Sequence, residues 1–91
     1  MVLADIRNQR NLRTCHTQRS DWRRALLAAD RCVELLDGDA EERRDRGAVL
    51  LRVGATSLAL ADLRSYLELR PDAADREAVE RLVAQTLAMA N

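Results

Sequence analysis

Apolar residues recur at helical spacing in five successive stretches of the chain, and short polar segments separate these stretches. Residues three and four positions apart lie on one face of an α-helix, so each stretch would present one apolar face. The predicted helices occupy residues 2–18, 20–37, 39–53, 56–70 and 73–90. The pattern therefore predicts an all-α fold of five helices.

Part of this pattern is repeated along the chain. The dipeptide Ala-Leu at 25–26 returns at 59–60, and Glu-Leu at 34–35 returns at 68–69. Both copies lie 34 residues further on, a period typical of helix–turn–helix arrays. Counted together with the capping residues at the helix ends, the predicted connections are two to four residues long, so successive helices should be antiparallel neighbours.

We therefore expect a right-handed α-solenoid that forms a single domain over residues 1–91. It would consist of a first hairpin at 2–37, a second at 39–71 and a capping helix at 73–90. A capping helix covers the apolar end that a stack of repeats otherwise leaves open.

Residues at the predicted helix ends support these boundaries. Ser20 is predicted to be the N-cap of the second helix, and Asp39 that of the third. Glu42 follows Asp39 at the spacing of a capping box. Gly54 and Pro71 are predicted to end the third and fourth helices.

Two further glycines have distinct predicted roles. Gly38 follows the second helix, where a left-handed residue commonly ends a helix. Gly47 lies inside the third helix, where glycine costs about 1 kcal/mol relative to alanine. We interpret Gly47 as a point of close contact between two helices.

Composition limits the classes of partner. Hydrophobic residues make up 47% of the chain, but Trp22 and Tyr66 are its only aromatic residues, so the core should consist of leucine and alanine. All fifteen basic residues are arginine, and fifteen acidic residues balance them. Without a net charge, no overall field attracts a nucleic acid or a membrane, and we expect neither as a partner.

The expected location is a reducing cytoplasm. No apolar run approaches the ~20 residues that span a bilayer, and the first ten residues lack the order of a signal peptide. Cys15 and Cys32 are then expected to be free thiols packed as small apolar residues.

The sequence contains no pattern typical of a catalytic or metal site. Cys15, His16 and Cys32 are the candidate soft ligands, but no C-x-x-C or H-x-x-x-H spacing occurs. Adjacent side chains on a helix point about 100° apart, which disfavours a Cys–His nucleophile. We expect no enzyme activity, no cofactor and no metal.

On the 34-residue frame, the segment that begins at residue 40 resembles a tetratricopeptide repeat (TPR). Gly47 falls at the small position of the first helix and Gly54 at the turn, while Pro71 closes the unit. In the earlier copy Arg13 stands where glycine or alanine is expected, and in the later copy Tyr66 replaces a small residue. The resemblance implies a helical repeat that binds proteins.

A narrower resemblance covers most of the chain. It rests on the segments NLR (11–13), DWRRAL (21–26), RRDRG (43–47), ALADL (59–63) and YLELRPDAAD (66–75). These segments resemble the C-terminal repeats of bacterial proteins that carry a transglutaminase-like domain, some of which are named as invasion-gene regulators. The resemblance implies that the chain is the C-terminal part of a longer protein. Any cysteine and histidine chemistry would then lie upstream.

In TPR proteins the first helix of each hairpin lines a concave groove, which places a candidate binding strip here. The predicted groove residues are Arg7, Arg10, Thr14, Thr17, Arg44, Ala48, Leu51 and Arg52. The first twenty residues contain four arginines and one acid. Guanidinium groups bind carboxylates in a two-pronged geometry, so an acidic peptide is the expected ligand. In the alternative interpretation, these arginines are solvated or pair with Asp45 and nearby acids.

Three functions remain open at this point. The first is a protein–protein interaction module that binds a peptide or protein surface in the groove. The second is a structural appendage that packs on an upstream transglutaminase-like domain through residues 2–18. The third is self-association as a homodimer through an edge that includes Leu87 and Met89.

Overall fold

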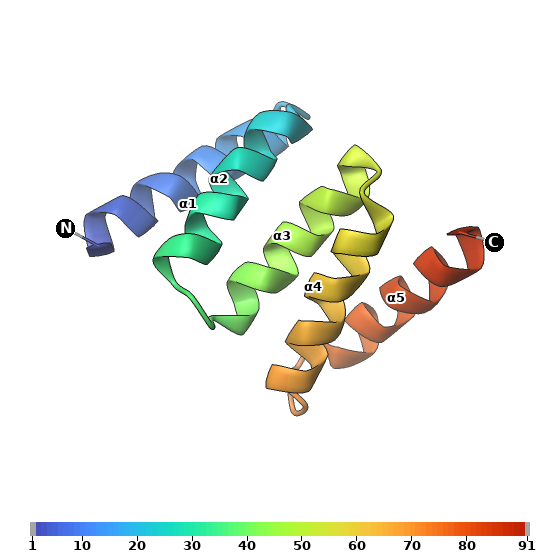
Figure 1. Cartoon of the computed structure of the whole chain (residues 1–91). Coiled ribbons are helices and arrows are strands. Elements are labelled where there is room, and N and C mark those ends of the chain that lie inside the picture. The colour runs from blue at the N-terminus through green and yellow to red at the C-terminus, as the bar shows by residue number, and fades with distance from the viewer. Residues whose placement is uncertain (1, 91) are drawn as a thin grey trace.

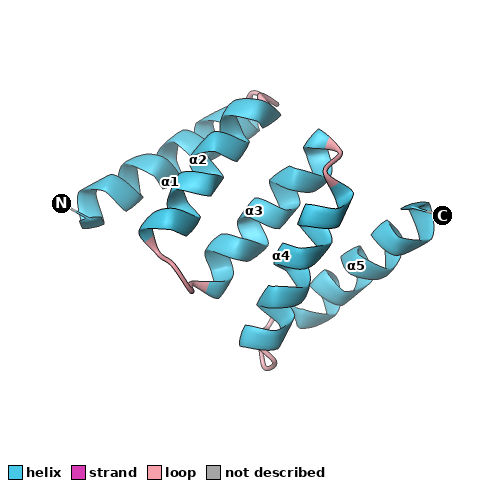
Figure 2. Cartoon of the chain, in the orientation of Figure 1, coloured by secondary structure: helices cyan, strands magenta, loops and turns pink. Residues whose placement is uncertain are grey.

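The computed structural model describes residues 2–90, which form five α-helices joined by loops and turns (Figure 2). The helices are α1 (Val2–Gln18), α2 (Trp22–Leu35), α3 (Ala40–Val53), α4 (Thr56–Leu69) and α5 (Arg76–Ala90). The described part of the chain contains no strand. The predicted all-α class and the number of helices are confirmed. The predicted domain also included residues 1 and 91, which lie outside the described residues.

The helices form a row of antiparallel neighbours. α1, α3 and α5 run in one direction, whereas α2 and α4 return between them (Figure 1). Each helix packs against the next one along the chain, and the array measures 41 × 28 × 19 Å. No helix between residues 2 and 90 has both the length and the apolar character needed to cross a membrane.

The core is built mainly from small side chains. Five alanines are buried, at positions 25, 28, 29, 40 and 59. Leu63 and Tyr66 of α4 pack with Ala40 of α3 and Val79 of α5 in one cluster. Small residues permit close helix contacts, and the two larger α4 side chains fill the space where three helices meet.

Gly47 has the predicted packing role. A Cβ atom at this position would lie 3.0 Å from Cγ of Leu63 and 3.3 Å from the carbonyl oxygen of Ala59. Both atoms belong to α4, so the absence of a side chain at position 47 lets α3 and α4 approach closely.

Two of the predicted helix ends are confirmed, and one predicted cap is wrong. The Asp39 carboxylate accepts a hydrogen bond from the Glu42 amide at 3.1 Å, and Gly54 ends α3 with a φ of 84°. The N-cap of α2 is Asp21, whose carboxylate accepts from the Arg24 amide at 3.3 Å, and not Ser20. Ser20 has a φ of 57°, a left-handed conformation that differs from the extended one of an N-cap.

Two boundaries differ from the prediction by a few residues. α2 ends at Leu35, and Gly38, with a φ of 85°, belongs to the turn that follows. α5 begins at Arg76, so the α4–α5 linker spans residues 70–75 and is longer than predicted. This linker is held by hydrogen bonds, because the Tyr66 hydroxyl donates to the Asp75 carboxylate and the Arg76 guanidinium donates to the Pro71 carbonyl.

Candidate functional site on the groove face

One face of the array, lined by α1, α3 and α5 and here called the groove face, contains two hollows. The α3–α5 hollow has a volume of about 570 Å³. Its lining residues are Ala48, Leu51, Arg52, Thr56, Leu82, Gln85, Thr86 and Met89. All of these side chains except Arg52 are uncharged, and none is acidic.

The second hollow, between α1 and α3, has a volume of about 310 Å³. Its lining residues are Arg13, Thr14, Thr17, Gln18, Asp45, Ala48 and Val49. Ala48 lines both hollows. The two hollows are therefore neighbours on either side of Ala48, in the C-terminal half of α3, and together they are here called the depression.

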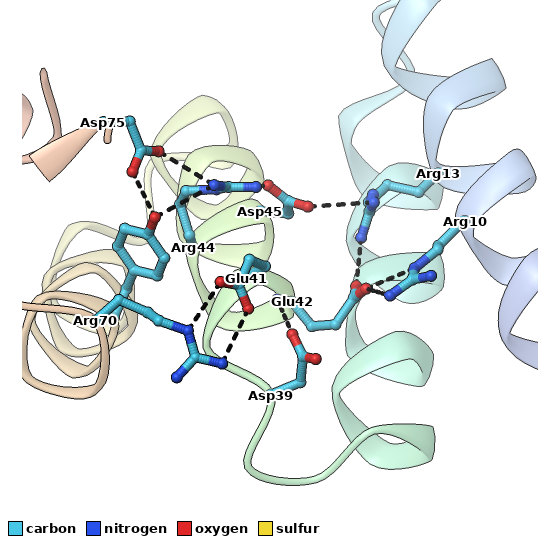
Figure 3. A network of polar contacts seen from close by, with 10 residues as sticks. Arg10, Arg13, Asp39, Glu41, Glu42, Arg44, Asp45, Arg70 and Asp75 are labelled. Atoms are coloured by element: carbon cyan, nitrogen blue, oxygen red, sulfur yellow. Dashed lines mark hydrogen bonds and ion pairs between the residues drawn. The ribbon is translucent and has the colours of Figure 1, made fainter. Parts of the chain in front are cut away.

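A network of ion pairs lies around the N-terminal half of α3 (Figure 3). Its centre is Glu42, whose side chain is 2% exposed. The Glu42 carboxylate accepts from Nε of Arg10 at 2.7 Å and from Nη1 of Arg13 at 2.8 Å. Both arginines belong to α1, so the network links the first hairpin to the second.

The network continues from α3 to the α4–α5 linker. Arg44 lies 3.0 Å from Asp45 and 3.1 Å from Asp75, and Asp45 also lies 3.3 Å from Nη2 of Arg13. The hydrogen bond from the Tyr66 hydroxyl lowers the pKa of the Asp75 carboxyl, and the Arg44 charge adds to this effect. The same hydrogen bond, together with burial, raises the pKa of Tyr66.

The side chain of Glu42 does not complete the predicted capping box. A capping box needs this carboxylate to accept from the Asp39 amide. That amide instead donates to the carbonyl oxygen of Leu36 at 3.0 Å. The Glu42 carboxylate is thus left to bind the two α1 arginines, a role that the sequence reasoning missed.

The structure divides the predicted groove residues into two groups. Thr14 and Thr17 line the α1–α3 hollow, and Leu51 and Arg52 line the α3–α5 hollow, with Ala48 common to both.

The other three predicted groove residues line neither hollow. Arg10 and Arg44 bind carboxylates within the chain, and Arg7 is exposed on α1. For Arg10 and Arg44 the structure agrees with the alternative in which groove arginines pair with nearby acids.

The prediction omitted the wall that α5 contributes, because it assigned residues 73–90 to a capping helix and to an edge for self-association. The 34-residue frame carried the missing signal. Residues 48, 51 and 52 of α3 correspond to Leu82, Gln85 and Thr86 of α5, and all three of these line the α3–α5 hollow. α5 thus occupies the position of the first helix of a third repeat.

The Arg52 guanidinium contacts an aromatic ring, whereas those of Arg10 and Arg44 contact carboxylates. It lies over the indole ring of Trp22, 5.1 Å from the ring centre. Within residues 2–90 no carboxylate oxygen lies within 4.0 Å of it. A cation–π contact orients the charge without neutralising it.

A second buried ion pair ties α3 to α4. Arg46 binds Asp62 through two bonds, from Nε at 2.7 Å and from Nη2 at 2.8 Å. Asp62 is 4% exposed. Such two-pronged pairing satisfies the buried carboxylate, so we assign the pair a structural role.

Comparison with known proteins identifies the family of the chain. A tetratricopeptide repeat family model matches residues 12–84. The chain belongs to the tetratricopeptide repeat family. The matched range extends from α1 into α5, in agreement with the position of α5 on the repeat frame.

Two relatives are UPF0162 proteins of Xylella fastidiosa. The chain is 41% identical over 66 residues to the protein of strain Temecula1 / ATCC 700964, and 39% identical over 66 residues to that of strain 9a5c. Each alignment covers 72% of this chain and 24% of the relative. The chain thus spans about a quarter of the length of these relatives. No solved structure matches the chain significantly.

Proposed function

We propose that the chain binds a peptide segment of a partner protein in the depression formed by the two hollows. TPR repeats generally mediate protein–protein interactions. The observation that supports this site is that Ala48 lines both hollows, so an extended chain that crosses α3 at Ala48 would contact both of them.

The chemistry of the depression suits this role. Leu51, Leu82 and Met89 offer apolar contact. Gln85 can donate and accept hydrogen bonds, and the Thr86 hydroxyl, which donates to the Leu82 carbonyl, can accept one. Concave sites with an apolar lining and a few polar groups are typical of ligand recognition. We propose no catalytic role for this module.

The test fills the depression at its centre. Random short peptides are selected by display for binding to the wild-type protein, and a selected peptide is mapped by NMR chemical shifts. We expect shifts at both hollows and loss of binding in Ala48→Trp, which adds bulk at an exposed junction residue. Ala61→Trp, at an exposed α4 position that lines neither of these two hollows, is the matched control. Binding that survives Ala48→Trp contradicts the proposal.

A second candidate is a structural role within a longer protein, on a domain of the transglutaminase-like kind. Two observations favour it: the relatives are about four times longer than the matched segment, and α1 leaves Leu3 76% exposed and Leu12 39% exposed. Apolar side chains on one helix would gain by contact with a further domain.

Hydrogen exchange on a Xylella relative tests this second candidate. Amides of its first repeat helix are compared in the full-length protein and in its isolated repeat segment. Stronger protection in the full-length protein supports contact with another domain, and equal protection contradicts it.

A reducing cytoplasm remains the proposed setting. Cys15 and Cys32 are both free thiols, and burial raises the pKa of the Cys32 thiol. A buried neutral thiol is poorly reactive, so Cys32 is suited to a packing role.

A further inference from the structure

Charge is distributed unevenly over the groove face. Around the N-terminal half of α3, Arg10 and Arg44 lie against the carboxylates of Glu42 and Asp75. Arg52 is the charged residue among those that line the α3–α5 hollow, and none of them is acidic. Arg52 also lines a neighbouring hollow together with Asp21 and Trp22. The α3–α5 hollow therefore has a basic lining residue in a chain whose formal net charge is zero.

Trp22 keeps that charge available to a ligand. The indole ring holds the Arg52 guanidinium at 5.1 Å from its centre, and an aromatic face neither neutralises the guanidinium nor accepts its N–H groups as a carboxylate would. Holding a long side chain in place before binding reduces the entropy lost on binding.

Aliphatic contacts lie beside the charge. Leu51 precedes Arg52 on α3, and Leu82 and Met89 face it from α5 across the same hollow. Met89 is 86% exposed, so a ligand can cover it. A fitting ligand therefore presents an apolar group next to a negative one.

We propose that the α3–α5 hollow binds an aliphatic side chain of a partner peptide and that Arg52 binds the carboxylate of an adjacent Asp or Glu side chain. This inference rests on the proposed function and names the chemistry of its ligand. A side-chain carboxylate is favoured over a terminal one, because the α1–α3 hollow lies directly beyond Ala48 and offers the peptide a second site to contact.

The test uses small blocked peptides as probes and follows backbone NMR shifts of the whole chain. N-acetyl-Leu-Glu-amide is compared with N-acetyl-Leu-Gln-amide, which lacks the charge, and with N-acetyl-Gly-Glu-amide, which lacks the aliphatic group. We expect the Leu-Glu probe to shift residues of the α3–α5 hollow and to bind about fivefold more tightly than either control, since a charge-assisted pair strengthens binding by about that factor.

Substitutions then assign the charge to Arg52. Arg52→Gln should weaken the Leu-Glu probe about fivefold and leave the Leu-Gln probe unchanged. Arg7→Gln, at another exposed arginine of the groove face, is the matched control and should change neither. Trp22→Leu should weaken the Leu-Glu probe, Trp22→Phe should retain most of the binding, and Trp22 emission should respond to the Leu-Glu probe alone.

The outcomes separate this inference from the proposed function. If Ala48→Trp abolishes binding of display-selected peptides while Leu-Glu and Leu-Gln probes bind equally, the groove function stands and the assignment to Arg52 is wrong. If no probe or selected peptide shifts the NMR signals of the hollow, both proposals fail.

Tighter binding of N-acetyl-leucine than of the Leu-Glu probe would assign the charge to a chain terminus. A dimer in sedimentation with shifts at Leu87 and Met89 would make a second copy the occupant. Each of these last two results overturns the inference.

Discussion

Arg13 of α1 and Gly47 of α3 occupy equivalent positions on the 34-residue frame but pack in opposite ways. Gly47 has no side chain, and the large Leu63 of α4 fills the space beside it. The residue of α2 equivalent to Leu63 is the fully buried Ala29. The first hairpin therefore combines a large residue on its first helix with a small one on its second, and the second hairpin has the reverse order.

This exchange of sizes shows why Arg13 is tolerated at a position where the repeat pattern expects glycine or alanine. Its guanidinium extends to α3, where it lies 2.8 Å from Glu42 and 3.3 Å from Asp45. One repeat position thus serves close packing within a hairpin in one copy and an ionic contact between hairpins in the other.

The largest loss of stability is expected when the second hairpin receives an arginine on its first helix, as the first hairpin has at Arg13. Gly47→Arg should reduce the free energy of unfolding by about 3–5 kcal/mol, because a side chain and a charge enter a space occupied by Leu63. Urea unfolding followed by circular dichroism measures this. Ala48→Arg, at the exposed neighbouring position, should change stability by less than about 0.5 kcal/mol.

A second variant tests whether the residues at positions 47 and 63 compensate for each other in size. Leu63→Ala in the Gly47→Arg background should recover about 1 kcal/mol or more, although it is destabilising by itself. Additive losses in the double variant would show that the two positions do not compensate for each other.

The ionic contact between hairpins is the next largest target. Glu42→Gln should cost about 2–3 kcal/mol, because two guanidinium groups lose a carboxylate that is almost fully buried. Glu41→Gln removes a neighbouring acid whose pair with Arg70 is solvent-exposed, and should cost less than about 1 kcal/mol. Thermal unfolding of the two variants side by side gives the difference, and equal losses would contradict a special role for Glu42.

Double-mutant cycles with Glu42 separate its two partners. Arg13 is 15% exposed and Arg10 is 45% exposed, so solvent screens the Arg13 pair less. We expect coupling energies of about 1–2 kcal/mol for Arg13 and below about 1 kcal/mol for Arg10. The reverse order would mean that burial does not control the strength of this contact.

The smallest effect concerns pH and the linker between α4 and α5. The folded pKa of Asp75 is lowered by the Tyr66 hydroxyl and by Arg44. The contribution of the Asp75 carboxylate to folding stability is therefore complete above the ordinary pKa of an aspartate, about 4. It is lost as the pH falls through the lower pKa that Asp75 has in the folded state.

Unfolding midpoints measured from neutral pH to below pH ~4 check this sign. Asp75→Asn should flatten the acid side of the profile, whereas Asp72→Asn, at an exposed linker position, should leave it as in the wild type. An unchanged profile in Asp75→Asn would exclude the proposed linkage.

Local signals in the sequence predicted most of the fold. Helix spacing, the Asp39 cap and the Gly54 stop depend on residues close together in the chain, and the structure confirms them. Gly47 was interpreted correctly because glycine inside a helix needs a packing reason. Ser20 was misassigned because Asp21 beside it is an equally good capping residue, and only the backbone conformation distinguishes the two.

The site was harder to predict because its features depend on partners from other helices. Glu42 at the third position of a helix fits a capping box and an interhelical ion pair equally well, and the sequence does not distinguish them. The sequence also gives no means to distinguish Arg10, Arg44 and Arg52 from one another. The structure separates them by what each one contacts: a buried acid, a linker carboxylate and an indole ring.

The contribution of α5 to the hollow has a thermodynamic consequence. Among its described side chains only Val79 is fully buried, so this helix should open locally at a lower free energy than α3 or α4. A ligand that requires α5 in place would then suppress this opening by mass action, by RT ln(1 + [L]/Kd). Slowed amide exchange in α5 would therefore report occupancy of the hollow.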